Sequence, residues 1–137
     1  MAPEVVQPLP ASPVASVGVA RAHTPDRGEI LAFCEKYRRA LELRDPAMIM
    51  ALVSPRYSDD GTTYDTLEGQ MRRIFREANS IRYEIKYGDV GQRGDAITVD
   101  YSYTASFLMA DGWHHKVGDA ELVLVRRGDS FAIISGM

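Results

Sequence analysis

Apolar and polar residues alternate over residues 96–109, AITVDYSYTASFLM. The odd-numbered residues are apolar: Ile97, Val99, Tyr101, Tyr103, Ala105, Phe107 and Met109. The even-numbered residues between them are polar: Thr98, Asp100, Ser102, Thr104 and Ser106. This period of two predicts a β-strand with one apolar face and one polar face. Such a strand spans roughly 45 Å, well beyond the usual ~5–6 residues. We therefore expect a strongly curved sheet, in which so long a strand can bend.

Three further strands are predicted beside this one. The preceding strand alternates between charged residues and Ile81, Tyr83, Ile85 and Tyr87. It is expected to end in a turn at Gly91–Gly94. Asp111-Gly112 is a two-residue hairpin signal leading into a strand over residues 113–127, and a turn at 127–130 leads into a last strand over 131–137. Sequential hairpins predict a four-stranded antiparallel meander.

The Asp111-Gly112 turn also predicts a register. It places Met109 opposite His114, Tyr103 opposite Ala120 and Tyr101 opposite Leu122. Asp119 and Glu121 then lie on the Ser/Thr face of the sheet. A glycine within a strand favours a bulge, however, and a bulge at Gly118 would move both carboxylates to the tyrosine face. Whether the domain has an acidic pocket depends on this register.

Helical periodicity predicts three helices before the sheet. The first begins at a capping box of Asp26 and Glu29, and Asp45-Pro46 ends it and opens a short second helix. Asp65 and Glu68 predict a further capping box at the start of the third helix. Helices followed by an antiparallel meander predict an α+β fold, with three N-terminal helices packed in the concave face of the curved sheet.

Residues 1–25 contain five of the seven prolines and have no apolar periodicity. We expect a disordered Pro/Ala-rich tail or tether here, and one domain over residues 26–137. The tail lacks the pattern of a signal peptide. Because such tethers follow the signal or lipid-attachment segment of exported proteins, we favour an exported or periplasmic location over a cytoplasmic one.

Composition limits the classes of function. The net charge of -3, without a basic cluster, argues against nucleic-acid binding, and the apolar runs are too short for a transmembrane segment. Cys34 is the only cysteine, and the adjacent His114 and His115 point to opposite faces of a strand. We therefore expect no metal site, and the glycines form no phosphate-binding motif that would indicate a cofactor.

The order helix, short helix, loop, helix and curved meander resembles the nuclear transport factor 2-like superfamily. That group includes ketosteroid isomerases, polyketide cyclases of the SnoaL type and scytalone dehydratase. The resemblance covers residues 26–137 and rests on ALELRDPAMIMALVSPRYSDDG, the capped third helix and the terminal FAIISGM. Within the group the chain is most similar to uncharacterised bacterial domains of exported, often lipid-anchored proteins. The resemblance implies a cone-shaped, cystatin-like α+β roll with a pocket, but not a substrate.

The interpretation we favour is a non-catalytic pocket or protein-interaction domain. We expect a modest cavity that binds a small apolar or aromatic ligand. Its walls are formed by Tyr37, Phe75, Tyr101 and Tyr103, and its mouth by Tyr57 and Tyr64. A further possibility is that the tyrosines fill the cone themselves. The outer sheet face carries apolar residues among its polar ones, and these predict a homodimer through that face: Leu108, Val117, Val123 and Val125.

The alternative is a small acid–base enzyme of the isomerase, cyclase or dehydratase type. Asp119 or Glu121 would be the general base, and the hydroxyl of Tyr57 or Tyr64 would stabilise a developing oxyanion. Of the remaining loop carboxylates, Asp59 and Asp60 are assigned to a polar turn. Asp65 is assigned to a helix cap.

Overall fold

The structure is a computed structural model that describes residues 26–137, so the predicted tail over residues 1–25 lies outside the described residues. Three helices and a small hairpin precede the main sheet: α1 (Arg27–Leu43), α2 (Pro46–Met50), β1 (Ser58–Asp59), β2 (Thr62–Thr63) and α3 (Tyr64–Glu77). The main sheet is an antiparallel meander in sequence order: β3 (Ser80–Arg93), β4 (Ala96–Met109), β5 (Gly112–Arg127) and β6 (Ser130–Ser135). The predicted α+β fold is confirmed.

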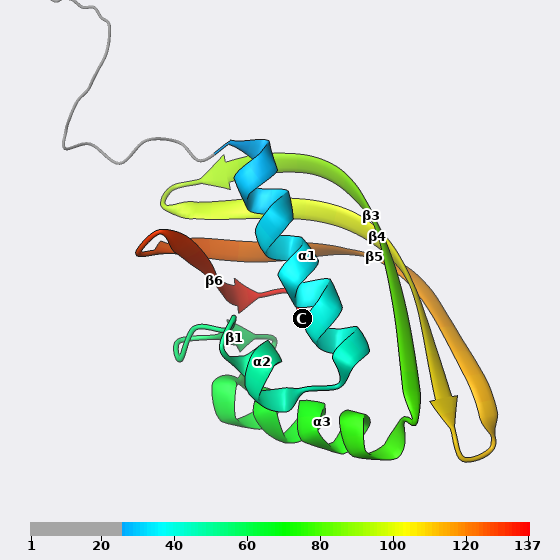
Figure 1. Cartoon of the computed structure of the whole chain (residues 1–137). Helices are drawn as coiled ribbons and strands as arrows, with labels where there is room; N and C mark the ends of the chain where they lie inside the picture. Colours follow the sequence, from blue (N-terminus) through cyan, green and yellow to red (C-terminus); the bar gives the residue numbers. More distant parts are fainter. Residues whose placement is uncertain (1–25) are drawn as a thin grey trace, which may run out of the picture.

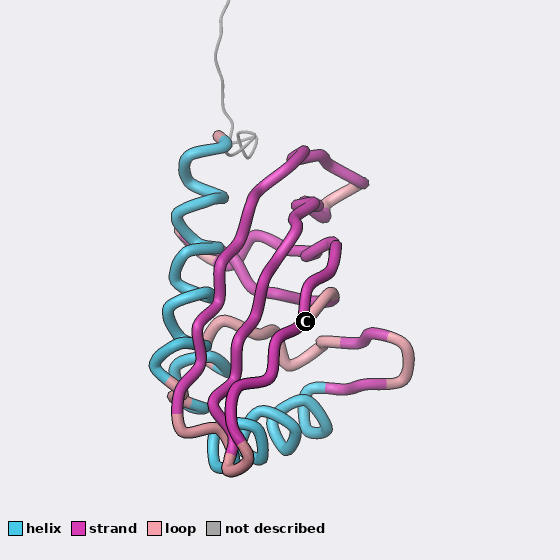
Figure 2. The backbone as a smooth tube through the Cα atoms, turned by 90° about the vertical axis from the view of Figure 1, so that its right-hand side faces the viewer, coloured by secondary structure: helices cyan, strands magenta, loops and turns pink. Residues whose placement is uncertain are grey.

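The sheet bends strongly along β3, β4 and β5, and the helices occupy its concave side (Figure 1). Helix α1 crosses the concave side, and α3 runs beneath it at the end where β3 begins. Figure 2 shows α1 upright at one side of the strands and α3 running across their lower end. The expected turn at Gly91–Gly94 is wrong, because β3 continues to Arg93. A register shift between Tyr87 and Val90 lets this long strand bend with its neighbour.

Local side-chain bonds begin the first two helices where the sequence predicts them. The Asp26 carboxylate accepts a hydrogen bond from the Glu29 amide at 2.7 Å, and Glu29 Oε1 accepts one from the Asp26 amide at 3.3 Å. Asp45 accepts from the Met48 amide at 3.1 Å, directly before Pro46. Both caps satisfy amide groups that a helix start leaves unpaired.

The predicted cap of the third helix is wrong. Helix α3 begins at Tyr64 with Thr63 as its N-cap residue, and no side chain caps it. Asp65 lies inside the first turn, and Glu68 pairs with Arg72 at 3.2 Å. The helix follows directly on strand β2, so the hairpin decides where it starts.

The β4–β5 register also differs from the prediction. The turn consists of residues 110 and 111, so Met109 pairs with Gly112 and each partner is two residues earlier than expected. Gly112 follows the turn with φ of 119°, a value that suits glycine. A displacement of two residues leaves every side chain on its predicted face. Tyr103 therefore pairs with Gly118, and Tyr101 pairs with Ala120.

Side chains of α1 cover the free edge of the sheet at β3. Glu42 Oε2 accepts from the Tyr83 amide at 2.9 Å, and the Arg38 guanidinium donates to the Tyr83 carbonyl at 3.4 Å. Arg27 donates to the Gly88 carbonyl at 3.0 Å. These bonds satisfy backbone groups that an edge strand would otherwise present to other chains.

Candidate functional site

A cavity of about 300 Å³ lies between the helices and the concave side of the sheet. Helices α1 and α3 and strands β3, β4 and β5 supply its walls, which are lined by Tyr37, Leu41, Met71, Ile74, Phe75, Ile81, Tyr83, Tyr101, Tyr103, Ala105, Phe107, Lys116, Ala120, Gly136 and Met137. All four residues predicted for the walls line this cavity: Tyr37, Phe75, Tyr101 and Tyr103.

Strand alternation and the register bring the aromatic residues together. Tyr83, Tyr101 and Tyr103 share the inward parity of β3 and β4. The rings of Tyr83 and Tyr103 stack with centroids 5.6 Å apart and an interplanar angle of 6°, and Tyr101 lies 6.0 Å from Tyr103. Tyr37 reaches them from α1, with its ring edge-on to Tyr83 at 6.2 Å. One helix and two strands thus build one aromatic wall.

Three tyrosine hydroxyls meet within this wall. Tyr37, Tyr83 and Tyr101 are 4%, 9% and 6% exposed. Burial raises the pKa of each phenol above its ordinary value, and charge interactions among the three groups raise the pKa of Tyr37 and Tyr101 further. The three hydroxyls lie close enough to shift one another's pKa. At neutral pH they therefore remain protonated and can donate hydrogen bonds to one another or to a ligand.

Gly118 accommodates a tyrosine ring and does not form a bulge. The β4–β5 ladder runs from Met109 to Ala96 in one register. A Cβ atom on Gly118 would lie 2.9 Å from the Tyr103 hydroxyl oxygen and 3.1 Å from its Cζ, because the ring lies across the glycine. The absence of a side chain at residue 118 thus leaves the space that the Tyr103 ring occupies.

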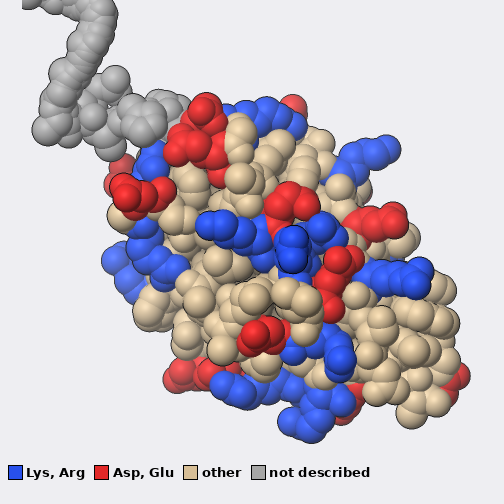
Figure 3. All heavy atoms as spheres, viewed as in Figure 1, with Lys and Arg blue, Asp and Glu red and all other residues tan. Residues whose placement is uncertain are grey.

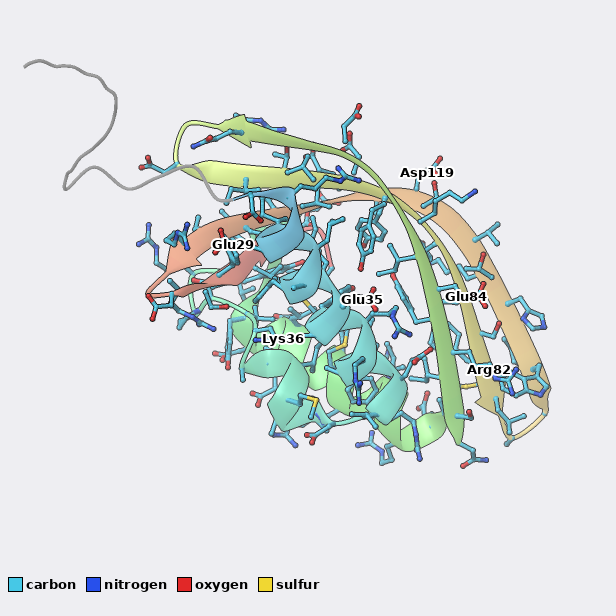
Figure 4. The ribbon with its side chains drawn as sticks, turned by 45° about the horizontal axis from the view of Figure 1, so that its top comes forward. Glu29, Glu35, Lys36, Arg82, Glu84 and Asp119 are labelled. Carbon is cyan, nitrogen blue, oxygen red and sulfur yellow. The ribbon has the colours of Figure 1, made fainter. Side chains whose placement is uncertain are left out.

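The carboxylates proposed for catalysis consequently lie on the outer face. Asp119 accepts from the Ser102 hydroxyl at 2.8 Å, and Glu121 pairs with Arg93 at 3.3 Å. Figure 4 shows Asp119 on the convex side of the sheet, directed away from the helices. Among the described residues that line the cavity, Lys116 is the one charged side chain.

The two tyrosines predicted at the mouth do not line the cavity. Tyr57 is 2% exposed, and its hydroxyl accepts from the Met137 amide at 3.0 Å. Tyr64 is half-buried at the start of α3. The predicted polar turn is present, because Asp60 and Gly61 have φ of 50° and 86° in the β1–β2 hairpin. This loop fastens the last strand, since Asp59 accepts from the Gly136 amide at 2.9 Å.

Sequence reasoning missed a polar cluster between α1 and β3. Glu35 accepts from the Tyr87 hydroxyl at 2.8 Å and from Arg38 at 2.9 Å, and Arg38 also pairs with Glu42 at 2.8 Å. Partial burial opposes ionisation of Glu35, but the bonds from Tyr87 and Arg38 outweigh it and lower its pKa. The spacing of three and four residues along α1 was the available signal. Figure 4 labels Glu35 on α1, on the side that faces the sheet.

This cluster is a carboxylate–tyrosine pair outside the cavity. Neither Glu35 nor Tyr87 lines it, and the Glu35 side chain is 46% exposed. A general base with a raised pKa requires an apolar surround, whereas the pKa of Glu35 is lowered. Acidic and basic side chains are interspersed on the face of the molecule shown in Figure 3. Because Glu35 lies outside the cavity and its pKa is lowered, the role of this cluster is to join helix α1 to strand β3.

The histidines of β5 lie apart, on opposite faces of the strand. His114 contacts Asp111 at 2.6 Å, and His115 contacts the Ser106 hydroxyl at 2.8 Å. Residues 26–137 contain no group of three or more His, Cys, Asp and Glu side chains that could hold a metal ion. No helix in this part of the chain is long and apolar enough to cross a membrane.

The elements and the cavity between them define the fold of nuclear transport factor 2-like proteins. No protein-family model and no curated relative matches the chain. A candidate dehydratase of the NTF2-like family from Streptomyces avermitilis is similar, with a TM-score of 0.70 and 13% identity over 80% of this chain and 91% of that one.

Two other solved structures illustrate the range of proteins with this fold. Bd1075 of Bdellovibrio bacteriovorus has a TM-score of 0.71 and 17% identity over 81% of this chain, which spans only 40% of Bd1075. A candidate calcium/calmodulin-dependent protein kinase II association domain from Xanthomonas campestris has a TM-score of 0.69 and 16% identity, over 82% of this chain and 86% of that one. At these identities the likeness establishes the fold alone.

Proposed function

We propose that this domain binds a small apolar or aromatic molecule in its cavity and does not convert it. The observation that carries the proposal is the lining of the cavity. Aromatic and aliphatic side chains form its walls, and the Tyr37, Tyr83 and Tyr101 hydroxyls remain neutral donors there. Pockets that combine an apolar lining with a few polar groups suit small organic ligands.

The lining also suggests how a ligand would be oriented. Lys116 lies on the inward parity of β5, opposite Ala105, and it is exposed at the cavity wall. A ligand with an acidic group would place that group at Lys116 and its apolar part among the tyrosines. Tyrosine hydroxyls can also stabilise an oxyanion, but the acid–base alternative needs a carboxylate in reach of the same ligand. Asp119 and Glu121 lie on the other side of the sheet.

Binding of a fluorescent probe tests the proposal. We suggest 8-anilinonaphthalene-1-sulfonate, an aromatic anion, with the full chain. Ala120→Leu places extra carbon atoms at the cavity wall and should weaken probe binding by about tenfold, equivalent to ~1.4 kcal/mol. Thr104→Leu, the matched control, adds apolar atoms on the outer face and should bind like the parent. Equal affinity of Ala120→Leu and the parent would refute the proposal. Independently of this probe, native mass spectrometry of the purified chain would identify a ligand that co-purifies with it.

We propose in addition that the domain forms a homodimer through the sheet. Val117, on the outer face of β5, is 73% exposed, an unusual state for a valine in the middle of a long strand. Trp113 is 43% exposed on the same face, where it stacks on His115 with centroids 6.4 Å apart and lies under Arg82 at 5.4 Å. Val117 thus offers the open apolar surface of this strand. Light scattering that gives a monomer at tens of micromolar would refute the homodimer.

An exported location remains our proposal for the compartment. It is supported only by the Pro/Ala-rich composition of residues 1–25. Fractionation of the producing cells into periplasm and cytoplasm tests it, and recovery of the protein only with cytoplasmic markers would contradict it.

A further inference from the structure

Lys116 places a positive charge on the wall of a largely apolar cavity. It lies on the inward face of β5 opposite Ala105, a buried residue that also lines the cavity. Within residues 26–137 its ammonium group makes no ion pair or hydrogen bond with another residue. Asp111, the acidic residue of the adjacent turn, contacts His114 at 2.6 Å instead. The charge of Lys116 is therefore available to a ligand.

The Tyr103 hydroxyl is a second polar group at the same wall. Its ring lies across Gly118, so that a Cβ atom placed on that glycine would be 2.9 Å from the hydroxyl oxygen. Gly118 and Lys116 are successive inward residues of β5, about 7 Å apart along the strand. Tyr103 is half-buried, and its hydroxyl has no hydrogen-bond partner in the described part of the chain. Because the lysine stem is flexible, both groups can reach one polar group of a ligand.

We propose that the cavity takes organic carboxylic acids, with the carboxylate held by the Lys116 ammonium and the Tyr103 hydroxyl. Both groups donate hydrogen bonds, and a carboxylate accepts several at once. The apolar body of the acid would pack against the aromatic wall of β3 and β4, where the rings of Tyr83 and Tyr103 stack. This inference rests on the proposed ligand-binding function and narrows the class of ligand.

The charges around the cavity also set the orientation of the acid. A second hollow of about 430 Å³ adjoins the cavity at Ile74 and Phe107, which line both. Two acidic residues, Glu77 and Asp111, line that second hollow. They would repel a carboxylate, whereas Lys116 attracts it. The carboxylate is therefore expected at Lys116, with the body of the acid directed toward the tyrosines.

A pair of ligands that differ only in charge tests the inference in the full chain. Naphthalene-2-carboxylate and naphthalene-2-carboxamide have the same shape, and the second is neutral. We expect the parent to bind the carboxylate roughly fivefold more tightly in isothermal titration calorimetry. The preference should shrink at high salt, because Lys116 is exposed and its charge is screened. The net charge of -3 gives the chain no general attraction for anions, so a preference requires a local positive group.

Three substitutions assign the preference to the two groups. Lys116→Met removes the charge and should abolish the preference while leaving the affinity for the amide unchanged, and Lys116→Arg should retain the preference. Tyr103→Phe should weaken carboxylate binding more than amide binding, because a charged acceptor makes the stronger hydrogen bond. Lys86→Met is the matched control. It makes the same charge change at an exposed residue opposite Ser102, on the outer face of the sheet, and should bind like the parent.

The outcomes separate this inference from the proposed function. Equal binding of the two compounds by the parent, or an equal loss of preference in Lys86→Met and Lys116→Met, would overturn the carboxylate site. If Ala120→Leu still weakened both compounds, the ligand-binding proposal would stand. Absence of binding of both compounds and of 8-anilinonaphthalene-1-sulfonate would refute the ligand-binding proposal, and the carboxylate site with it.

Discussion

Replacement of Tyr101 by phenylalanine removes one hydroxyl from the cavity wall and keeps the ring. Tyr101 is 6% exposed, so its hydroxyl depends on protein partners, and the hydroxyls of Tyr37 and Tyr83 interact with it. The substitution thus tests whether the three hydroxyls satisfy one another. It leaves the stacked pair of Tyr83 and Tyr103 intact.

The magnitude follows from counting protons. If the three hydroxyls bond one another, they have three protons and at least three acceptor positions, so each proton can have a partner. With two hydroxyls left, one donates to the other and the remaining proton loses its partner. An unpaired buried donor costs ~1–3 kcal/mol. For a domain of this size we expect the Tm to fall by roughly 4–12 °C.

Urea denaturation monitored by the fluorescence of Trp113, the single tryptophan, measures this change. The midpoint should fall while the slope m stays constant, because the surface exposed on unfolding is unchanged. Tyr64→Phe is the matched control. It makes the same chemical change at a half-buried residue outside the cavity and should alter stability by less than ~0.5 kcal/mol. A Tyr101→Phe protein as stable as the parent would refute the hydroxyl network.

Three further predictions concern the groups around the cavity. The lowered pKa of Glu35 stabilises the fold above the ordinary carboxyl pKa, and this contribution is lost as pH falls through the folded value. Tyr87→Phe should therefore reduce the loss of stability between pH 7 and pH ~3, whereas an unchanged pH dependence in urea titrations would contradict this. Burial raises the pKa of the Cys34 thiol to about 12, so a disulfide reagent should modify it only on unfolding; rapid modification of the native protein would refute this. Asp119→Asn and Glu121→Gln should leave probe affinity unchanged. If the parent turned over an isomerase, cyclase or dehydratase substrate and either variant abolished that turnover, the acid–base enzyme would be established instead.

The sequence alone determined the faces of the strands and two of the helix caps. Alternation places Tyr101 and Tyr103 on the concave side whatever the exact register, because a side chain changes face only with an odd displacement. Asp26 and Asp45 act within three residues of the amides that they cap. Both kinds of information are local, so the aromatic wall from β4 could be predicted without knowledge of its neighbours.

The start of the third helix and the register of the long hairpin were not determined locally. Thr63 rather than Asp65 precedes the helix because strand β2 runs directly into it. The β4–β5 turn uses residues 110 and 111, with Gly112 after them, although Asp111-Gly112 is the stronger turn signal by itself. Here the pairing of two long strands outweighs the preference of a two-residue turn.

Only the tertiary structure decided which polar groups meet. Glu35 and Tyr87 are 52 residues apart in sequence, and their bond exists because α1 lies along the edge of β3. The β4–β5 register continues without a bulge at Gly118, where the Tyr103 ring lies across the glycine. This register places Lys116 in the cavity wall and keeps the Asp119 carboxylate out of it. Strand β6 pairs only with residues 123–127 of β5, and Gly136, which follows β6, lies against the backbone of Glu121. These features depend on contacts between distant segments, which no periodicity within a single segment encodes.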